Sequence, residues 1–187
     1  FQHSPTVAIS LQKNSINTAK DMFGKRVMSF GGADVELFAM LLQEGISTKS
    51  VDWQPISYTI NSLIAGDTDL YSSYLTNEPF FLEQQQIPYS IINPINYGID
   101  FYSDILFTST REIIENPRRV QAFREASLRG WQYALQHPEE IVDLILRDYR
   151  SDKSREHLLF EARETTKLIR SEVAPVGHIN QGRIFHM

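Results

Sequence analysis

The order of hydrophobic and polar positions divides the chain into two halves of different character. In the first half, short apolar runs rich in β-branched residues alternate with segments of helical period. The predicted strands are residues 7–11, 25–30, 51–57, 70–74, 89–92 and 105–108. Strands separated by helices at this spacing predict an α/β fold with a largely parallel sheet that is covered on both faces.

Helices are expected between these strands, at about residues 33–44, at 59–65 and from Asn77 onward. In the first of them Val35, Phe38, Leu41 and Leu42 share one face at helical spacing. Gly45 follows where a left-handed C-terminal cap belongs, and Gly66 stops the second helix. In the third helix Pro79 is tolerated, because a first turn needs no N–H donor there.

From Thr110 onward the pattern predicts helices only. They begin near Pro117, Pro138 and Ser154. The first is long and carries an apolar stripe of Val120, Phe123, Leu128, Trp131 and Leu135. A helix with one apolar face needs another layer to pack on, and this half of the sequence offers no sheet for that purpose.

Composition excludes several classes of function. The 187 residues carry a formal charge of -5 with no basic cluster, which argues against nucleic acid as a partner. No apolar run approaches the roughly 20 residues that span a bilayer. The absence of cysteine removes disulfides, thiolate nucleophiles and cysteine metal sites. The histidines show no metal-ligand spacing such as HExxH, so neither a metal nor a cofactor is expected.

The segment from Asp67 to Asp104 concentrates aromatic rings and acids in predicted loops. Rings with polar tips suit a flat polar solute, since they stack on its faces while carboxylates hold its edge. Glu78 has two interpretations. It can be an ordinary acid at a helix start, or a carboxylate that accepts hydrogen bonds from an amidine-like edge such as that of an aminopyrimidine. Tyr74 and Asn77 beside it favour the second interpretation.

Two further segments leave alternatives open. Gly31-Gly32 lies between a strand and a helix, and is either an anion cradle or a plain tight turn. It is not GxGxxG and no Walker lysine follows, which disfavours a nucleotide. The loop of residues 97–104 is either a bulky connection or the wall of a cleft, with Tyr97 and Tyr102 stacking and Asp100 fixing an edge.

Several segments together resemble one family, the periplasmic-binding-protein-like proteins related to thiamine-pyrimidine synthesis and transport. They are FQHSP (1–5), GKRVMSFGGADVELFAML (24–41), YLTNEP (74–79), YGIDFYSDILFT (97–108), RGWQYALQHPEE (129–140) and GHIN (177–180). The resemblance implies a type II solute-binding fold, in which two α/β lobes close on the solute. It places residues 1–23 in a crossover and the remainder of lobe one, 24–104 in lobe two, and 105–187 in a return crossover with the C-terminal helices of lobe one.

The resemblance also implies the site residues. They are Gly31, Gly32, Glu36, Tyr74, Asn77, Glu78, Tyr97, Asp100 and Tyr102. The family begins with roughly eighty to ninety further residues that build most of the first lobe's sheet, a size expected for half a domain. We therefore expect the N-terminal part of lobe one to be missing here. Apolar helix faces left without that sheet predict oligomerisation or partial disorder.

The expected function is the extracytoplasmic or periplasmic binding of a small solute, such as a thiamine-precursor-like pyrimidine, by lobe closure. The expected partner is an ABC permease, or a fused signalling domain of a histidine kinase or diguanylate cyclase. This domain itself is not expected to be an enzyme. One alternative is a pyrimidine-synthesis enzyme of the same fold, but the eukaryotic synthases use a histidine and a cysteine-rich motif, and this chain has no cysteine. Another is an interaction module with a vestigial cleft.

Overall fold

The computed structural model describes residues 1–185, which form two compact units. Unit 1 contains residues 1–4 and the chain from Tyr102 onward, and unit 2 contains Pro5–Phe101. The predicted third segment, 105–187, ends with His186 and Met187, which lie outside the described residues. Each unit is described by itself. How the two units correspond to the lobes expected from the sequence stays a prediction.

Unit 2 is built on a five-stranded mixed sheet with the order β3-β2-β4-β1-β5. The strands are β1 (Thr6–Leu11), β2 (Arg26–Ser29), β3 (Asp52–Pro55), β4 (Leu70–Tyr74) and β5 (Tyr89–Ile92). β2 pairs in parallel with β3 and β4, whereas β1 pairs antiparallel with β4 and β5. The prediction of a largely parallel sheet is therefore wrong in detail. The pattern of apolar positions shows that β1 is a strand, but it does not carry the strand's direction.

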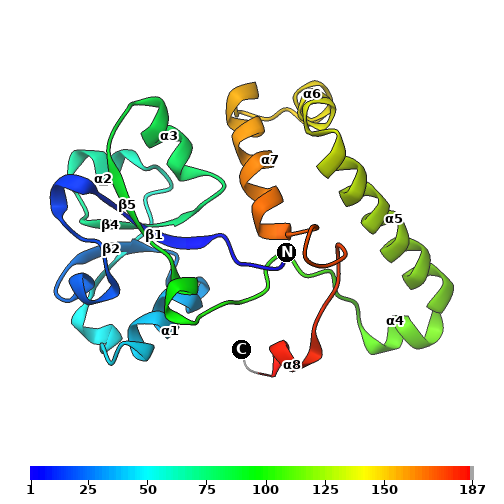
Figure 1. The fold of residues 1–187 in the computed structure, drawn as a ribbon, viewed down its shortest axis with the longest axis horizontal. Coiled ribbons are helices and arrows are strands. Elements are labelled where there is room, and N and C mark those ends of the chain that lie inside the picture. Colours follow the sequence, from blue (N-terminus) through cyan, green and yellow to red (C-terminus); the bar gives the residue numbers. More distant parts are fainter. Residues whose placement is uncertain (186–187) are drawn as a thin grey trace. The chain divides into compact units, whose positions relative to one another are not determined.

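Helices cover both faces of this sheet, as the sequence predicts (Figure 1). One face packs against α1 (Val35–Gln43), and the other against α2 (Asn61–Ala65) and α3 (Glu78–Gln84). Side chains alternate along β1, so that Ala8 joins the α1 core while Val7 and Ile9 join the opposite core. The strand is thus buried along its whole length.

The predicted inner face of α1 is wrong by part of a turn. Val35 and Leu42 are exposed, while Leu37, Met40 and Leu41 are fully buried. Almost every position of this helix is apolar, so its pattern fits more than one face, and packing against the sheet selects one. The predicted caps are confirmed: Gly45 and Gly66 have φ values of 71° and 85°, in the left-handed region that favours glycine.

Short 3-10 turns complete unit 2. They are η1 (Gln12–Asn14), η2 (Ala19–Met22), η3 (Gly31–Ala33), η4 (Thr48–Ser50) and η5 (Pro94–Tyr97). In η2 the side chain of Asp21 accepts from the backbone and hydroxyl of Thr18, which forms a capping box. These turns connect strands without adding a layer to the fold.

Unit 1 contains helices and, among the residues that the structure describes, no strand. The helices are α4 (Thr110–Glu115), α5 (Pro117–Gln136), α6 (Pro138–Asp148), α7 (Arg155–Ile169) and α8 (Gln181–Ile184). The predicted strand at 105–108 is wrong, because these apolar residues have no neighbouring strand to pair with and form no regular element. Ser154 caps α7 by accepting from the N–H of His157, at a distance of 3.2 Å.

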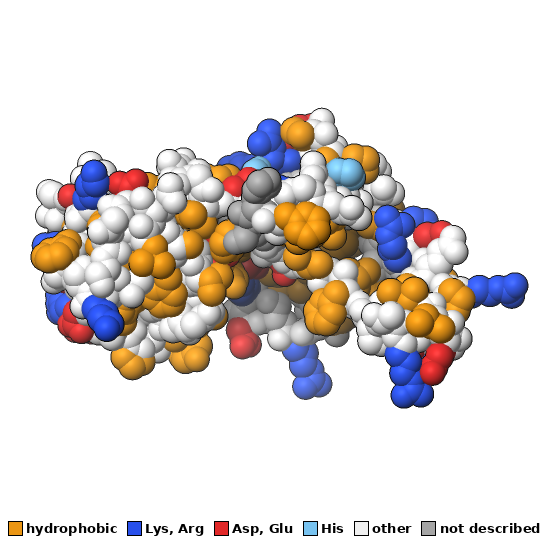
Figure 2. Space-filling view, turned by 90° about the horizontal axis from the view of Figure 1, so that it is seen from below, with side chains coloured by type: hydrophobic (Ala, Val, Ile, Leu, Met, Phe, Trp, Pro, Cys, Tyr) orange, Lys and Arg blue, Asp and Glu red, His pale blue; other side chains and the backbone are white. Residues whose placement is uncertain are grey.

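The apolar stripe of α5 is present, but no residue of this helix is buried. Phe123 and Trp131 are 62% and 41% exposed, and Phe107, before α4, is 88% exposed. Figure 2 shows such hydrophobic side chains at the surface of the helical unit. No described helix is both long enough and apolar enough to cross a bilayer. The exposed stripe therefore belongs to an amphipathic helix that lacks a covering layer within the described residues.

Candidate functional site

Six of the nine predicted site residues follow strands β2 and β4, at the carboxyl ends of these strands. Gly31, Gly32 and Glu36 follow β2, whereas Tyr74, Asn77 and Glu78 end β4 and begin α3. Because β2 and β4 are adjacent and parallel, these residues meet at one edge of the sheet. Ligands of open α/β sheets bind at the carboxyl ends of the strands, so we call this edge the carboxyl edge and treat it as the candidate site.

Glu78 is held in place by three hydrogen-bond donors at this edge. Its Oε2 accepts from the hydroxyl of Ser73 and from the backbone N–H of Tyr74, both at 2.9 Å. Its Oε1 accepts from the side-chain amide of Asn77 at 2.8 Å. The structure thus brings the predicted group of Tyr74, Asn77 and Glu78 together, and it does so with the carboxylate as the common acceptor.

A second carboxylate at the same edge, Asp34, was missed by the sequence analysis. Asp34 is only 2% exposed, and its Oδ2 accepts from the hydroxyl of Ser29 at 2.6 Å and from the N–H of Phe30 at 2.8 Å. Its Oδ1 accepts from the hydroxyl of Ser72 at 2.8 Å. The only sequence signal for this network is an acid placed directly before a helix, which is common and carries little information.

The glycine turn before α1 is held by the same network. Gly31 has a φ of 66°, and its N–H donates to the hydroxyl of Ser29 at 2.9 Å. Asp34 takes the neighbouring N–H of Phe30. The anion beside this turn is therefore the protein's own carboxylate. A contact of Gly31, Gly32 or the buried Glu36 with a ligand stays a prediction.

Tyr71 lies beneath Glu78 and connects it with the segment after β3. Burial raises the pKa of the Tyr71 phenol above its ordinary value, and the carboxylate of Glu78 adds to this rise. A hydrogen bond with the Ser57 side chain acts in the opposite direction. The phenol therefore remains protonated near neutral pH and positions the loop that begins at Ser57.

The remaining three predicted residues lie away from this group. The hydroxyl of Tyr97 accepts from the N–H of Ala19 at 2.9 Å, and its ring packs against the core beneath α1. Asp100 is half-buried in the stretch that ends unit 2. Tyr102 belongs to unit 1, where its hydroxyl accepts from the N–H of Asn180 at 3.0 Å and Arg183 lies 4.1 Å from its ring centroid. Their contact with a ligand stays a prediction.

Unit 1 contains an apolar groove of about 500 Å³ of its own. Phe1 and Trp131 meet there edge to face, with ring centroids 5.2 Å apart, and Tyr102 and Phe123 also line it. The described residues contain no group of three or more His, Asp or Glu side chains placed to hold a metal ion.

Comparison with known proteins shows the family. The family described as "NMT1/THI5 like" matches residues 1–141. The chain belongs to the NMT1/THI5-like family. It is 26% identical over 87 residues to the formylaminopyrimidine-binding protein of Halalkalibacterium halodurans, a match that covers 46% of this chain and 26% of that protein. It is also 26% identical over 150 residues to the riboflavin-binding protein RibY of Chloroflexus aurantiacus, which covers 78% of this chain and 42% of the relative.

Solved structures with the same fold are ABC-type solute-binding proteins. The periplasmic aliphatic sulphonate binding protein SsuA from Escherichia coli matches with a TM-score of 0.65 at 12% identity, over 90% of this chain and 52% of that protein. The alkanesulfonate-binding protein SsuA from Xanthomonas axonopodis pv. citri, bound to MOPS, matches with a TM-score of 0.60 at 12% identity, over 92% and 63%. These matches confirm the predicted type II binding-protein fold.

Two limits of length follow from these matches. The chain spans about a quarter of one curated relative and about two fifths of the other, and between half and two thirds of the two SsuA structures. All four proteins are binding proteins by name, not enzymes. The family therefore agrees with the prediction that this domain binds a solute and does not catalyse a reaction.

Proposed function

We propose that this chain is part of an extracytoplasmic solute-binding protein that holds a small nitrogen heterocycle at the carboxyl edge of unit 2. Glu78 is the polar anchor of this site. Its carboxylate accepts hydrogen bonds from N–H groups on the edge of the ligand, and nearby aromatic rings contact the ligand's faces. The ligand leaves the site chemically unchanged.

The arrangement around Glu78 carries this proposal. A carboxylate has about four acceptor positions, and three of them are used by Ser73, Tyr74 and Asn77. The remaining position is on Oε1, which accepts only from Asn77 within the group. The carboxylate is therefore fixed in direction before a ligand arrives, so little conformational entropy is lost on binding.

A pyrimidine is the ligand we propose. The amino group and ring nitrogens of an aminopyrimidine present donors and acceptors on one edge, and the flat ring presents two faces. The relative from Halalkalibacterium halodurans, whose name describes a formylaminopyrimidine-binding protein, supports this ligand class. A thiamine-precursor-like pyrimidine belongs to the same chemical class.

The proposed mechanism is closure of two lobes on the solute. Unit 2 is the lobe that carries the anchor, which includes β1 because this strand pairs with β4 and β5. A ligand that prefers the closed state shifts the balance between open and closed forms. An ABC permease is the partner that would read the closed form, which is supported by the ABC import function of the structural relatives. A fused signalling domain and an oligomer remain predictions of the sequence.

A binding measurement on matched variants tests this function. Isothermal titration of the purified protein with formylaminopyrimidine should give saturable binding, and Glu78→Ala should weaken it by about 10- to 100-fold, since a charge-assisted hydrogen bond contributes about 1.5–3 kcal/mol. Glu83→Gln is the control. Glu83 lies on the same helix but is exposed and accepts from the hydroxyl of Tyr89.

The outcome is read together with folding, because Glu78 also fixes the start of α3. Circular dichroism should show that Glu78→Gln keeps the wild-type helix content while it loses affinity. If the wild-type protein binds neither formylaminopyrimidine, riboflavin nor an alkanesulfonate, the proposed function is wrong. Release of a chemically altered product would instead indicate an enzyme.

A further inference from the structure

Two exposed aromatic rings stand together at the carboxyl edge of unit 2, and the sequence analysis did not single them out. Phe30 directly follows β2 and Tyr58 follows β3, and these two strands are adjacent and parallel. The ring centroids are 5.9 Å apart with an interplanar angle of 66°. Phe30 is 42% exposed and Tyr58 is 83% exposed, so the pair leaves ring surface open to solvent.

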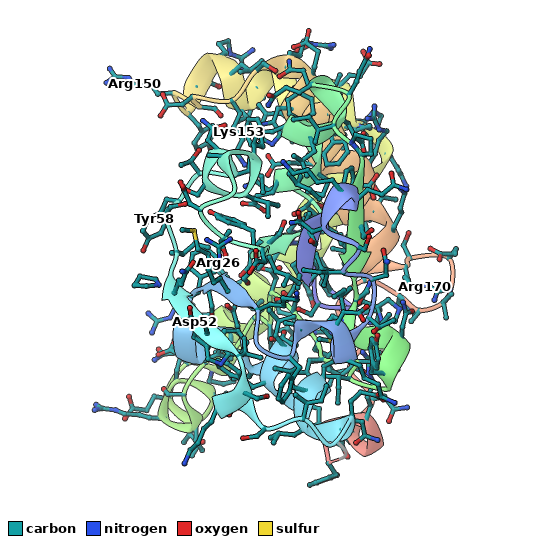
Figure 3. The ribbon with its side chains drawn as sticks, turned by 90° about the vertical axis from the view of Figure 1, so that its left-hand side faces the viewer. Arg26, Asp52, Tyr58, Arg150, Lys153 and Arg170 are labelled. Carbon is teal, nitrogen blue, oxygen red and sulfur yellow. The ribbon has the colours of Figure 1, made fainter. Side chains whose placement is uncertain are left out.

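Tyr58 is held in an unfavourable backbone conformation. Its φ is 56°, in the left-handed region that bulky side chains rarely adopt. Strain of this kind persists only where the surrounding structure enforces it, and it is concentrated at ligand sites. Figure 3 labels Tyr58 on the segment that follows β3.

The neighbouring residues fix this segment from the inside. The hydroxyl of Ser57 donates to the carbonyl of Thr59 at 3.0 Å and is also hydrogen-bonded to the phenol of Tyr71. Tyr71 is 1% exposed and lies within electrostatic reach of both Glu78 and Tyr58. The aromatic pair and the carboxylate anchor are therefore connected through one buried phenol.

The charges of unit 2 are divided between the two edges of its sheet. Its basic residues all follow β1 or precede β2 and β3, which places them on the amino side of the parallel strands: Lys13, Lys20, Lys25, Arg26 and Lys49. The carboxyl side holds the carboxylates of Asp34, Glu36 and Glu78. A ligand with a sulfonate or phosphate group would meet like charge at this edge, with no cation of unit 2 to offset it.

We infer that Phe30 and Tyr58 form the ring-stacking pair of the site and select a planar heteroaromatic ligand without negative charge. This inference rests on the proposed function and deepens it. The strained loop presents the Tyr58 ring to one face of the ligand, Phe30 supports that ring edge to face, and Glu78 accepts from the ligand's edge. The pair thus determines specificity for ring-shaped solutes, although both SsuA relatives are named for sulfonates.

Titrations with three probes test the inference: formylaminopyrimidine, riboflavin and benzenesulfonate, an anion with a ring of similar size. Wild-type protein should bind at least one of the first two and should bind benzenesulfonate at least 10-fold more weakly. Tyr58→Ala and Phe30→Ala should each weaken ring binding by about 10-fold, because stacking on one aromatic side chain contributes on that order. Tyr58→Phe keeps the ring and should retain most of the affinity.

Phe23→Ala is the matched control. This ring is 69% exposed and belongs to the same unit, but it lies before β2, on the amino side of the sheet. Its removal should leave affinity unchanged.

Three results would overturn the inference. If the wild-type protein binds a ring and both alanine variants bind it equally well, the pair is not the stacking element, while the proposed function stands. Equal affinity for benzenesulfonate would overturn the charge selection. Binding of none of the probes would remove the proposed function and this inference together.

Discussion

The hydroxyl of Ser72 donates a 2.8 Å hydrogen bond to Asp34, and both side chains are almost completely buried. The next residue, Ser73, donates to Glu78 instead. Because successive side chains of a strand point to opposite faces, adjacent serines of β4 serve two carboxylates on the two sides of the sheet. One strand end therefore positions both acids of the carboxyl edge.

The buried bond between Ser72 and Asp34 should contribute measurably to stability. Ser72→Ala removes one donor from a buried carboxylate, and we expect the free energy of unfolding to fall by about 1–3 kcal/mol in urea denaturation. Ser90→Ala is the control, since Ser90 donates to Asn17 in an exposed position where water can replace it. An equal loss in the two variants would contradict the buried role of Ser72.

The pair of Arg26 and Asp69 should make stability depend on acid. The carboxylate of Asp69 accepts from the Nη2 of Arg26 at 2.8 Å, and also from its Nε and backbone N–H. Hydrogen bonding from the Arg26 side chain holds the pKa of Asp69 below its ordinary value. A lowered folded pKa means that this stabilisation is present above the unfolded value of about 3.9 and is lost as pH falls through the folded value.

Asp69→Asn should therefore lower the free energy of unfolding near pH 7 by about 1 kcal/mol and flatten its decline between about pH 5 and pH 2. Urea denaturation across this range measures both effects. Arg26→Ala removes the partner (Figure 3) and should flatten the acid decline in the same way. An unchanged decline in Asp69→Asn would show that other carboxylates dominate it.

Relief of the strain at Tyr58 should stabilise the unbound protein. In Tyr58→Gly the left-handed φ of 56° carries no penalty, and the exposed ring leaves little burial to lose, so we expect an increase of about 0.5–1 kcal/mol. Tyr74→Gly, at the end of β4 where φ is not positive, should decrease stability by about 1 kcal/mol. Thermal unfolding of both variants checks the contrast, and equal losses would remove the argument from strain.

Two glycines of unit 1 should respond oppositely to the same substitution. A Cβ on Gly177 would lie 2.5 Å from Cδ2 of Leu128, and its φ is +78°, so Gly177→Ala should destabilise the protein by about 1–3 kcal/mol. Gly130 lies inside α5 with open space around it, so Gly130→Ala should stabilise the helix by up to about 1 kcal/mol. Urea denaturation of unit 1 reports both changes. The same sign in both would be contrary to this assignment.

Much of the fold of unit 2 could be predicted from local signals. The alternation of apolar runs located β1 to β5, and Gly45 and Gly66 marked two helix ends. These features depend on a residue and its near neighbours, which a pattern records directly. The group of Tyr74, Asn77 and Glu78 could be found for the same reason, since its members lie within five positions of each other.

The features that the pattern did not provide all depend on distant partners. The apolar run at 105–108 has strand character, but a strand exists only where another strand pairs with it. The direction of β1 and the inner face of α1 were likewise decided by what packs against them.

The sequence by itself determined which segments become strands and helices, and which acid begins α3. Only the tertiary structure decided that Asp34 is a buried carboxylate served by Ser72, 38 positions later, and that Phe30 and Tyr58 meet as a pair. The physical reason is that propensity and hydrophobic period act over a few residues. A hydrogen bond or ring contact across the sheet instead requires the parallel order of β2, β3 and β4, which exists only in the folded chain.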